Sequence, residues 1–169
     1  MKELIETYAW YNRKANIGLI QIVRDHPELA TRENTTYYGS ILALFSHILL
    51  SDLTWLRRLG AQETFRAKVS GVRFSSVADK PFSTLNEFAD HRYELDGAIE
   101  TYCRTLAEEA LSLPVEYRNS KRRKFTQQRW QVLLHMFNHQ THHRGQIAQV
   151  LDENGIENDV SNIIWYLRE

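Results

Sequence analysis

The sequence predicts an all-α protein, a four-helix bundle with a short helix near its C-terminal end. Three observations lead to this fold. Four long segments repeat apolar residues at helical spacing, the three prolines fall at boundaries between segments, and strand-type alternation is sparse. Helices of this kind bury their apolar stripes against one another. With 169 residues, the chain is expected to form a single domain over residues 1–169.

Each expected helix lies between recognisable start and stop signals. Pro27 ends the first helix and Pro114 the third, because proline pushes the residue before it out of the helical conformation. Gly60 and Gly155 are expected to end the second and fourth helices. The expected ranges are about residues 2–24, 37–59, 84–113 and 127–154 for the long helices, and 160–167 for the short one. The expected N-cap residues are Thr35 or Thr36, Ser83 and Thr126 for the second, third and fourth helices.

Two connections differ from ordinary bundle loops. Residues 60–82 form a long connection, and long loops are often functional. Residues 115–118 and 124–126 flank a polar turn and are compatible with a small β-hairpin. The basic run at residues 121–124 lies in that turn, and we interpret it as a solvated loop rather than a nucleic-acid contact.

The composition narrows the class of protein. Lys and Arg number 21 and so do Asp and Glu, which argues against a nucleic-acid binder that depends on a broad basic field. One cysteine, Cys103, excludes an internal disulfide framework and fits a reducing compartment. The first residues lack the apolar core of a signal peptide, and no apolar run approaches the ~20 residues of a membrane span. We therefore expect a cytoplasmic protein without a membrane or nucleic-acid partner.

The fourth expected helix carries a pair of histidines with metal-ligand spacing. His139 and His143 are four residues apart, and residues i and i+4 lie on one face of a helix, so their imidazoles can converge on one ion. At about 100° per residue, both share a stripe with core-type residues, whereas His135 and His142 fall towards a flank. The alternative is a pair of hydrogen-bonded core histidines without a metal.

A catalytic metal site usually has three protein ligands, and His47 is the candidate third. It lies in the middle of the second helix, in a stretch that is otherwise almost wholly apolar. Helical periodicity permits His47 to face a neighbouring helix but does not require it. Gln140 follows His139 where a HExxH peptidase has glutamate. Because glutamine cannot act as a general base, an ordinary zinc-peptidase mechanism is not expected.

The chain resembles the DinB family, or DinB/YfiT-like superfamily, over nearly its whole length. YAWYNRKAN at residues 8–16 is similar to the family's first helix, and GSILALFSHILLSDLTWLRRLG at 39–60 to its second, with His47 in the ligand position. LLHMFNHQTHHRGQI at 133–147 contains the characteristic HxxxHRGQ, with His139 and His143 in the ligand positions. The tail IIWYLRE at 163–169 is also similar to family members.

This resemblance implies a bundle with one longer crossover, frequent homodimers and one divalent metal ion per chain held by His47, His139 and His143. Zinc or nickel is the expected metal, since imidazole ligands suit several divalent ions. The resemblance further implies a metal-dependent hydrolase or a low-molecular-weight-thiol S-transferase. The alternative is a non-catalytic metal-binding stress-response protein with a structural or sensing metal. The sequence names no catalytic acid or base.

Three further polar residues have expected roles in the fold or beside the histidines. Asp52 falls inside the apolar arc of the second helix, so it should be paired. We favour a structural ion pair with Arg13 or Arg144 over an orienting contact to a metal ligand. Gln146 falls close to the ligand face and can contact a bound water or substrate, whereas Arg144 falls on the opposite side and braces the fold.

The fourth helix also carries a second apolar face, away from the histidines. Burial against the third helix would explain it, and so would a homodimer seam, which we favour slightly. Its residues are Trp130, Leu133, Leu134, Phe137, Ala148 and Leu151.

Overall fold

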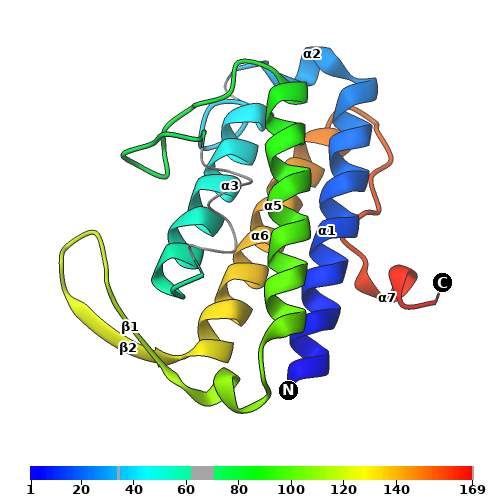
Figure 1. Ribbon diagram of the computed structural model, residues 1–169. Helices are drawn as coiled ribbons and strands as arrows, with labels where there is room; N and C mark the ends of the chain where they lie inside the picture. The colour runs from blue at the N-terminus through cyan, green and yellow to red at the C-terminus, as the bar shows by residue number, and fades with distance from the viewer. Residues whose placement is uncertain (34, 62–70, 169) are drawn as a thin grey trace.

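The computed structural model describes residues 1–33, 35–61 and 71–168. Four long helices dominate it, which confirms the predicted all-α bundle (Figure 1). Their bounds are Lys2–Asp25 for α1, Ile41–Arg58 for α3, Leu85–Thr105 for α5 and Arg129–Asp152 for α6. No helix in the described part of the chain is long and apolar enough to cross a membrane.

The helices form a bundle in which α1 and α3 each pack against both α5 and α6. Figure 1 shows α1 and α6 running in one direction and α3 and α5 in the other. Because α3 and α5 are parallel neighbours, a crossover joins them, of which residues 62–70 lie outside the described part of the chain. This is the predicted longer crossover. In this arrangement α3 and α6 lie side by side and antiparallel, with their central turns facing each other.

Helix α3 starts four residues later than predicted. Gly39 adopts φ +109° and bonds back to Thr36, so the chain turns there instead of continuing as a helix. Ser40, not Thr35 or Thr36, is the N-cap, and its hydroxyl accepts a hydrogen bond from the Ala43 amide at 3.2 Å. At the other end, Gly60 takes φ +70° directly after the helix, as expected of a stop signal.

Helix α5 ends eight residues earlier than predicted, although the following residues favour helix. The Lys2 ammonium group donates to the carbonyl oxygens of Arg104 and Leu106 at 3.0 and 2.7 Å, which satisfies the helix end there. The chain then forms a short 3₁₀ helix, η1 (Glu109–Ser112), before Pro114. The N-cap of α5 is Thr84 rather than Ser83. A tertiary contact from α1 thus accompanies the early end of α5.

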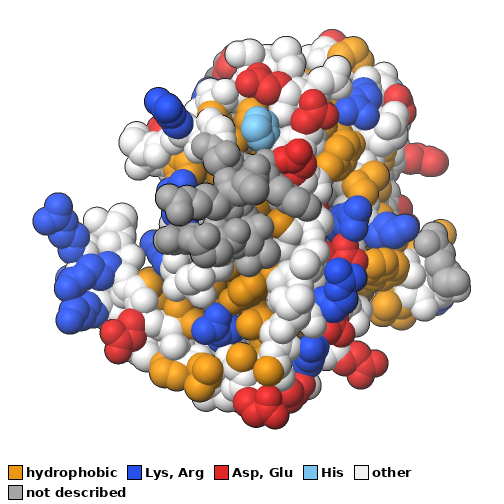
Figure 2. All heavy atoms as spheres, viewed as in Figure 1, with side chains coloured by type: hydrophobic (Ala, Val, Ile, Leu, Met, Phe, Trp, Pro, Cys, Tyr) orange, Lys and Arg blue, Asp and Glu red, His pale blue; other side chains and the backbone are white. Residues whose placement is uncertain are grey.

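The β-hairpin with which residues 115–118 and 124–126 are compatible is present between α5 and α6. Strand β1 (Pro114–Arg118) pairs antiparallel with β2 (Lys124–Gln128). Because β2 extends to residue 128, Gln128 replaces Thr126 as the N-cap of α6, in a capping box with Gln131. The basic run at residues 121–124 is exposed at the hairpin tip, where Figure 2 shows Lys and Arg side chains gathered.

Two short helices complete the chain. Helix α2 (Pro27–Ala30) follows α1 directly, and α7 (Ile163–Tyr166) is shorter than the predicted 160–167. The second apolar face of α6 is covered largely from within the chain, but by α1 and not by the third long helix. Phe137, for example, is fully buried and stacks on Tyr8 at 6.1 Å between ring centroids. The homodimer stays a prediction, and this face does not support it.

Candidate metal centre

The structure brings the three predicted histidines together between α3 and α6. The Nε2 atom of His139 lies 3.2 Å from Nε2 of His47 and 3.0 Å from Nε2 of His143. The three ligand atoms all lie within 4.8 Å of one another. His47 and His143 are buried and His139 is half-buried. Helical periodicity allowed His47 to face a neighbouring helix without requiring it. In the structure His47 does face α6.

Backbone and side-chain acceptors fix the orientation of two of these rings. His47 Nδ1 lies 2.9 Å from the Val77 carbonyl oxygen, and His143 Nδ1 lies 2.6 Å from Oε1 of Gln146. Both oxygens can only accept, so each Nδ1 carries the proton and each Nε2 of the neutral ring presents a lone pair. Such contacts to the far nitrogen are typical of metal-ligating histidines.

The donor set fits a divalent cation. With metal–nitrogen bonds of about 2.0–2.1 Å, two imidazole nitrogens of a tetrahedral zinc site lie about 3.3 Å apart, close to the 3.0 and 3.2 Å found here. Without a cation, one proton on His139 Nε2 can bond to only one of its two neighbours. The second ring nitrogen of His139 is buried and has no partner among the described residues.

Burial keeps the three imidazoles neutral. Desolvation, with the neighbouring imidazoles adding to it, lowers the pKa of His139 to about 3. Desolvation also lowers the pKa of His47 and of His143. Neutral imidazole is the form that binds metal, so no histidine of the cluster has to lose a proton before it binds a cation at neutral pH.

Tyr38 is a site residue that the sequence did not reveal. Its ring stacks on His47 at 4.0 Å between centroids, and its hydroxyl lies 3.0 Å from His47 Nε2. Desolvation raises the pKa of Tyr38, so the hydroxyl keeps its proton. Tyr38 falls inside the expected second helix, residues 37–59, but it lies in the turn before α3, so helical spacing does not describe its direction. The hydroxyl can donate a hydrogen bond to a group held beside the three imidazoles.

The other two histidines of this stretch lie outside the cluster, as predicted. His135 and His142 are exposed on α6, and neither belongs to the group whose nitrogens converge. The His135 ring is nevertheless a neighbour of His139, at 6.1 Å between centroids.

Comparison with known proteins places this arrangement in a family. A model of the DinB family matches residues 1–169. The chain belongs to the DinB family. No curated protein sequence matches it. Among solved structures, YfiT from Bacillus subtilis is similar with a TM-score of 0.65 at 15% identity, over 93% of this chain and 91% of that chain. YfiT is described as a probable metal-dependent hydrolase with an unusual four-helix bundle topology.

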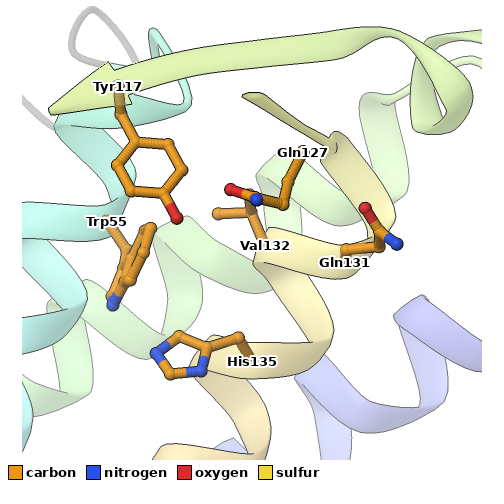
Figure 3. Close-up of a pocket in the computed structure, with 6 residues that line it drawn as sticks. All are labelled: Trp55, Tyr117, Gln127, Gln131, Val132 and His135. Atoms are coloured by element: carbon orange, nitrogen blue, oxygen red, sulfur yellow. The ribbon is translucent and has the colours of Figure 1, made fainter. Parts of the chain in front are cut away.

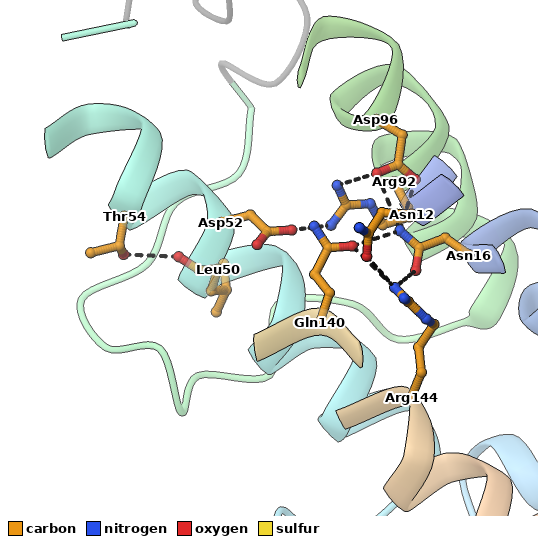
Figure 4. A network of polar contacts seen from close by, with 9 residues as sticks. All are labelled: Asn12, Asn16, Leu50, Asp52, Thr54, Arg92, Asp96, Gln140 and Arg144. Carbon is orange, nitrogen blue, oxygen red and sulfur yellow. Dashed lines mark hydrogen bonds and ion pairs between the residues drawn. The ribbon is translucent and has the colours of Figure 1, made fainter. Parts of the chain in front are cut away.

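A buried polar network joins α1, α3, α5 and α6 in this DinB-family bundle (Figure 4). Asp52 pairs with Arg92 of α5, not with Arg13 or Arg144, at 2.6 Å. The second guanidinium nitrogen of Arg92 bonds to Asp96 at 2.6 Å. The structural interpretation of Asp52 is therefore supported, with a different partner. Desolvation raises the pKa of Asp52 to about 6, although the Arg92 cation opposes the shift.

The network continues from α5 to α1 and α6. Arg144 is fully buried and donates to Oδ1 of Asn12 at 2.7 Å and of Asn16 at 3.2 Å, so it braces the fold as expected. The amide oxygen of Gln140 accepts from Asn16 at 3.0 Å. The position that carries the catalytic glutamate in HExxH peptidases thus serves core packing in this DinB-family chain.

The half-buried Gln146 contacts His143, one of the three candidate ligands, and this contact leads to a prediction. Replacing it by leucine removes the acceptor for His143 Nδ1, so we expect metal affinity to fall about 10–100-fold. The control is Gln149→Leu, since Gln149 is exposed and its side chain bonds to Glu153. Competition with a chromophoric chelator measures both affinities. Equal affinities in the two variants would contradict an orienting role for Gln146.

Proposed function

We propose that this DinB-family protein is a metal-dependent enzyme, a hydrolase or a low-molecular-weight-thiol S-transferase. Its cofactor is one divalent ion per chain, zinc or nickel, bound by His47, His139 and His143. The observation that carries the proposal is the convergence of three neutral imidazole nitrogens whose group includes no carboxylate or thiolate from the described residues. Three protein ligands with a free position are typical of catalytic rather than structural zinc.

The chemistry follows from this donor set. The three neutral imidazoles would leave a bound divalent ion its full positive charge, and the chemistry supplied there would be activation of a water or thiol near neutral pH. The protein's own groups supply orientation. Val77 and Gln146 hold two imidazoles with their Nε2 lone pairs inward, and Tyr38 offers a hydroxyl proton at their edge.

Both reaction types remain part of the proposal, for different reasons. The similarity to YfiT, described as a probable metal-dependent hydrolase, supports hydrolysis. Thiol transfer rests on the family resemblance. For that reaction the thiol has to come from a small molecule, because Cys103 is 1% exposed and burial raises its pKa to about 12. A thiol with that pKa is almost entirely protonated at neutral pH and is a poor nucleophile.

The alternative is a non-catalytic metal-binding stress-response protein. A fourth protein ligand would favour that alternative, because it would close the coordination shell. Among the described residues the converging group has three histidines and no fourth ligand, which favours catalysis instead.

The test compares activity with and without the metal centre. Zinc- and nickel-loaded protein is incubated with activated esters and amides, and separately with bacillithiol and an electrophilic bimane. We expect turnover of one class that chelation removes and that His47→Ala lacks, while His142→Ala retains it. Rates that are equal in the loaded, chelated and His47→Ala samples would overturn the catalytic proposal and favour the non-catalytic alternative.

We propose in addition that the protein is a cytoplasmic homodimer. The free thiol of Cys103 fits a reducing compartment, and the dimer rests on the family resemblance. Light scattering of the eluting protein gives its mass directly. A mass of about 20 kDa, that of one chain, would contradict the dimer.

A further inference from the structure

A pocket of about 290 Å³ lies between α3, the hairpin and the first turns of α6. Figure 3 shows its side chains facing a common space, with contributions from all three elements. Its volume is near the lower end of the range for small-molecule sites, about 300–1,000 Å³, so it suits one ring system. The lining residues are Trp55, Tyr117, Gln127, Gln131, Val132 and His135.

The aromatic walls of the pocket are held in a fixed arrangement. Trp55 meets Tyr117 edge-on at 5.1 Å and His135 edge-on at 4.9 Å between ring centroids. The Arg58 guanidinium lies 4.3 Å from the Trp55 ring centroid and 5.0 Å from that of Tyr117. It also donates to the Arg118 carbonyl oxygen at 3.3 Å. Cation–π contacts and this hydrogen bond therefore tie the end of α3 to strand β1, which makes the pocket preorganised.

One polar atom of the pocket lacks a partner. Gln127 is opposite Val115 in the hairpin, and its Oε1 atom is buried without a hydrogen-bond partner among the described residues. In Figure 3 the Gln127 amide points towards the space beside Tyr117. A buried acceptor without a donor is unfavourable. A ligand that donates an N–H or O–H to this oxygen would satisfy it.

The pocket adjoins the histidine cluster. His135, which lines the pocket, precedes His139 by one helical turn, and their ring centroids are 6.1 Å apart. A helical turn rises about 5.4 Å. A molecule with a ring in the pocket would therefore have to extend past His135 to reach the Nε2 atom of His139.

We infer that this pocket binds a planar aromatic group bearing an N–H or O–H donor, as part of the substrate whose reacting group lies at His47, His139 and His143. The last clause rests on the proposed function. Trp55 and Tyr117 contact the ring, and Gln127 Oε1 accepts its hydrogen bond. The assigned substrate class is an aromatic compound with a short side chain that carries the reacting group.

The first test measures the pocket without reference to the metal. Indole, a neutral planar ring with one N–H donor, is titrated into chelator-treated protein and followed by NMR. We expect the affinity to fall about tenfold or more in Gln127→Leu, which loses the acceptor but keeps similar bulk. Trp55→Ala should weaken binding at least as much. The matched controls, Trp165→Ala and Gln149→Leu, alter exposed residues elsewhere and should bind as the wild type does.

The second test asks whether the pocket belongs to the metal site. Indole-3-acetohydroxamic acid joins the ring to a metal-chelating group, and acetohydroxamic acid lacks the ring. On metal-loaded protein the ring should improve affinity at least tenfold, and Gln127→Leu should lose that gain while retaining its metal. No indole binding, equal binding in Gln127→Leu, or no gain from the ring would each overturn the inference. Absence of metal binding with intact indole binding would instead overturn the proposed function and the link to it.

Discussion

Replacing Arg92 by alanine is expected to lower the free energy of unfolding by about 3–5 kcal/mol, the cost of breaking a buried ion pair from one side. Arg92 is 1% exposed and bonds to both Asp52 and Asp96. Its removal leaves two buried carboxyl groups without the cation between them. Urea unfolding with linear extrapolation measures the change.

Arg13→Ala is the matched control for this prediction. Arg13 bonds to Glu100 at 2.6 Å, the same distance as in the Arg92 pairs, but its side chain is 45% exposed. Exposed pairs contribute about 0–1 kcal/mol, so this variant should be nearly as stable as the wild type. If the two arginine variants lost similar stability, burial would not be the reason for the effect.

The deficit of Arg92→Ala should depend on pH in a defined direction. Desolvation raises the pKa of both Asp52 and Asp96, and the Arg92 cation opposes the shift. Without that cation both values rise further, so the folded variant binds protons at higher pH than the wild type does. Because protonation removes the unpaired buried charge, the stability lost should be smaller at pH 5 than at pH 8. A deficit that grows as the pH falls would contradict this account.

The second large effect is expected at the histidine cluster. His47→Ala, His139→Ala and His143→Ala should each lose stoichiometric metal binding, with affinity falling more than the ~100-fold upper end for outer contacts. Each substitution leaves two imidazole nitrogens, which seldom suffice for zinc-type metals. Equilibrium dialysis against zinc or nickel measures the loss.

His135→Ala and His142→Ala are the controls for the histidine variants. Both residues are exposed on the same helix and lie outside the converging group. They should bind metal as tightly as the wild type. Tight binding retained by any of the three cluster variants would show that the ligand assignment is wrong.

The spacing of His139 and His143 was enough to predict that they share a face, because i and i+4 contacts depend only on helix geometry. His47 was different. Its position on α3 permitted a contact with α6 but did not require one, and its assignment as a metal ligand came from the family resemblance. In the structure its ligand nitrogen lies within 4.8 Å of those of His139 and His143. The four long helices were predictable for a similar reason, since apolar periodicity and proline positions are local signals.

Features that depend on long-range packing were not predictable. Arg92 was not identified as the partner of Asp52, because the two are 40 residues apart and meet only across the folded bundle. Likewise, the end of α5 is contacted by Lys2, more than 100 residues away in the chain, which no local pattern indicates. Tyr38 was expected inside the second helix but lies in the turn before α3, and Val77 lies in the connection after that helix. Helical spacing therefore could not predict their contacts with His47.

The central claim is that one divalent ion is bound by the three histidines. Metal content of the purified, untagged protein by mass spectrometry tests it most directly, beside a His47→Ala/His139→Ala double variant. We predict about one zinc or nickel ion per chain in the wild type and none in the double variant, each after reconstitution and desalting. No metal in either protein, or equal amounts in both, would contradict the claim and leave a helical bundle with hydrogen-bonded core histidines.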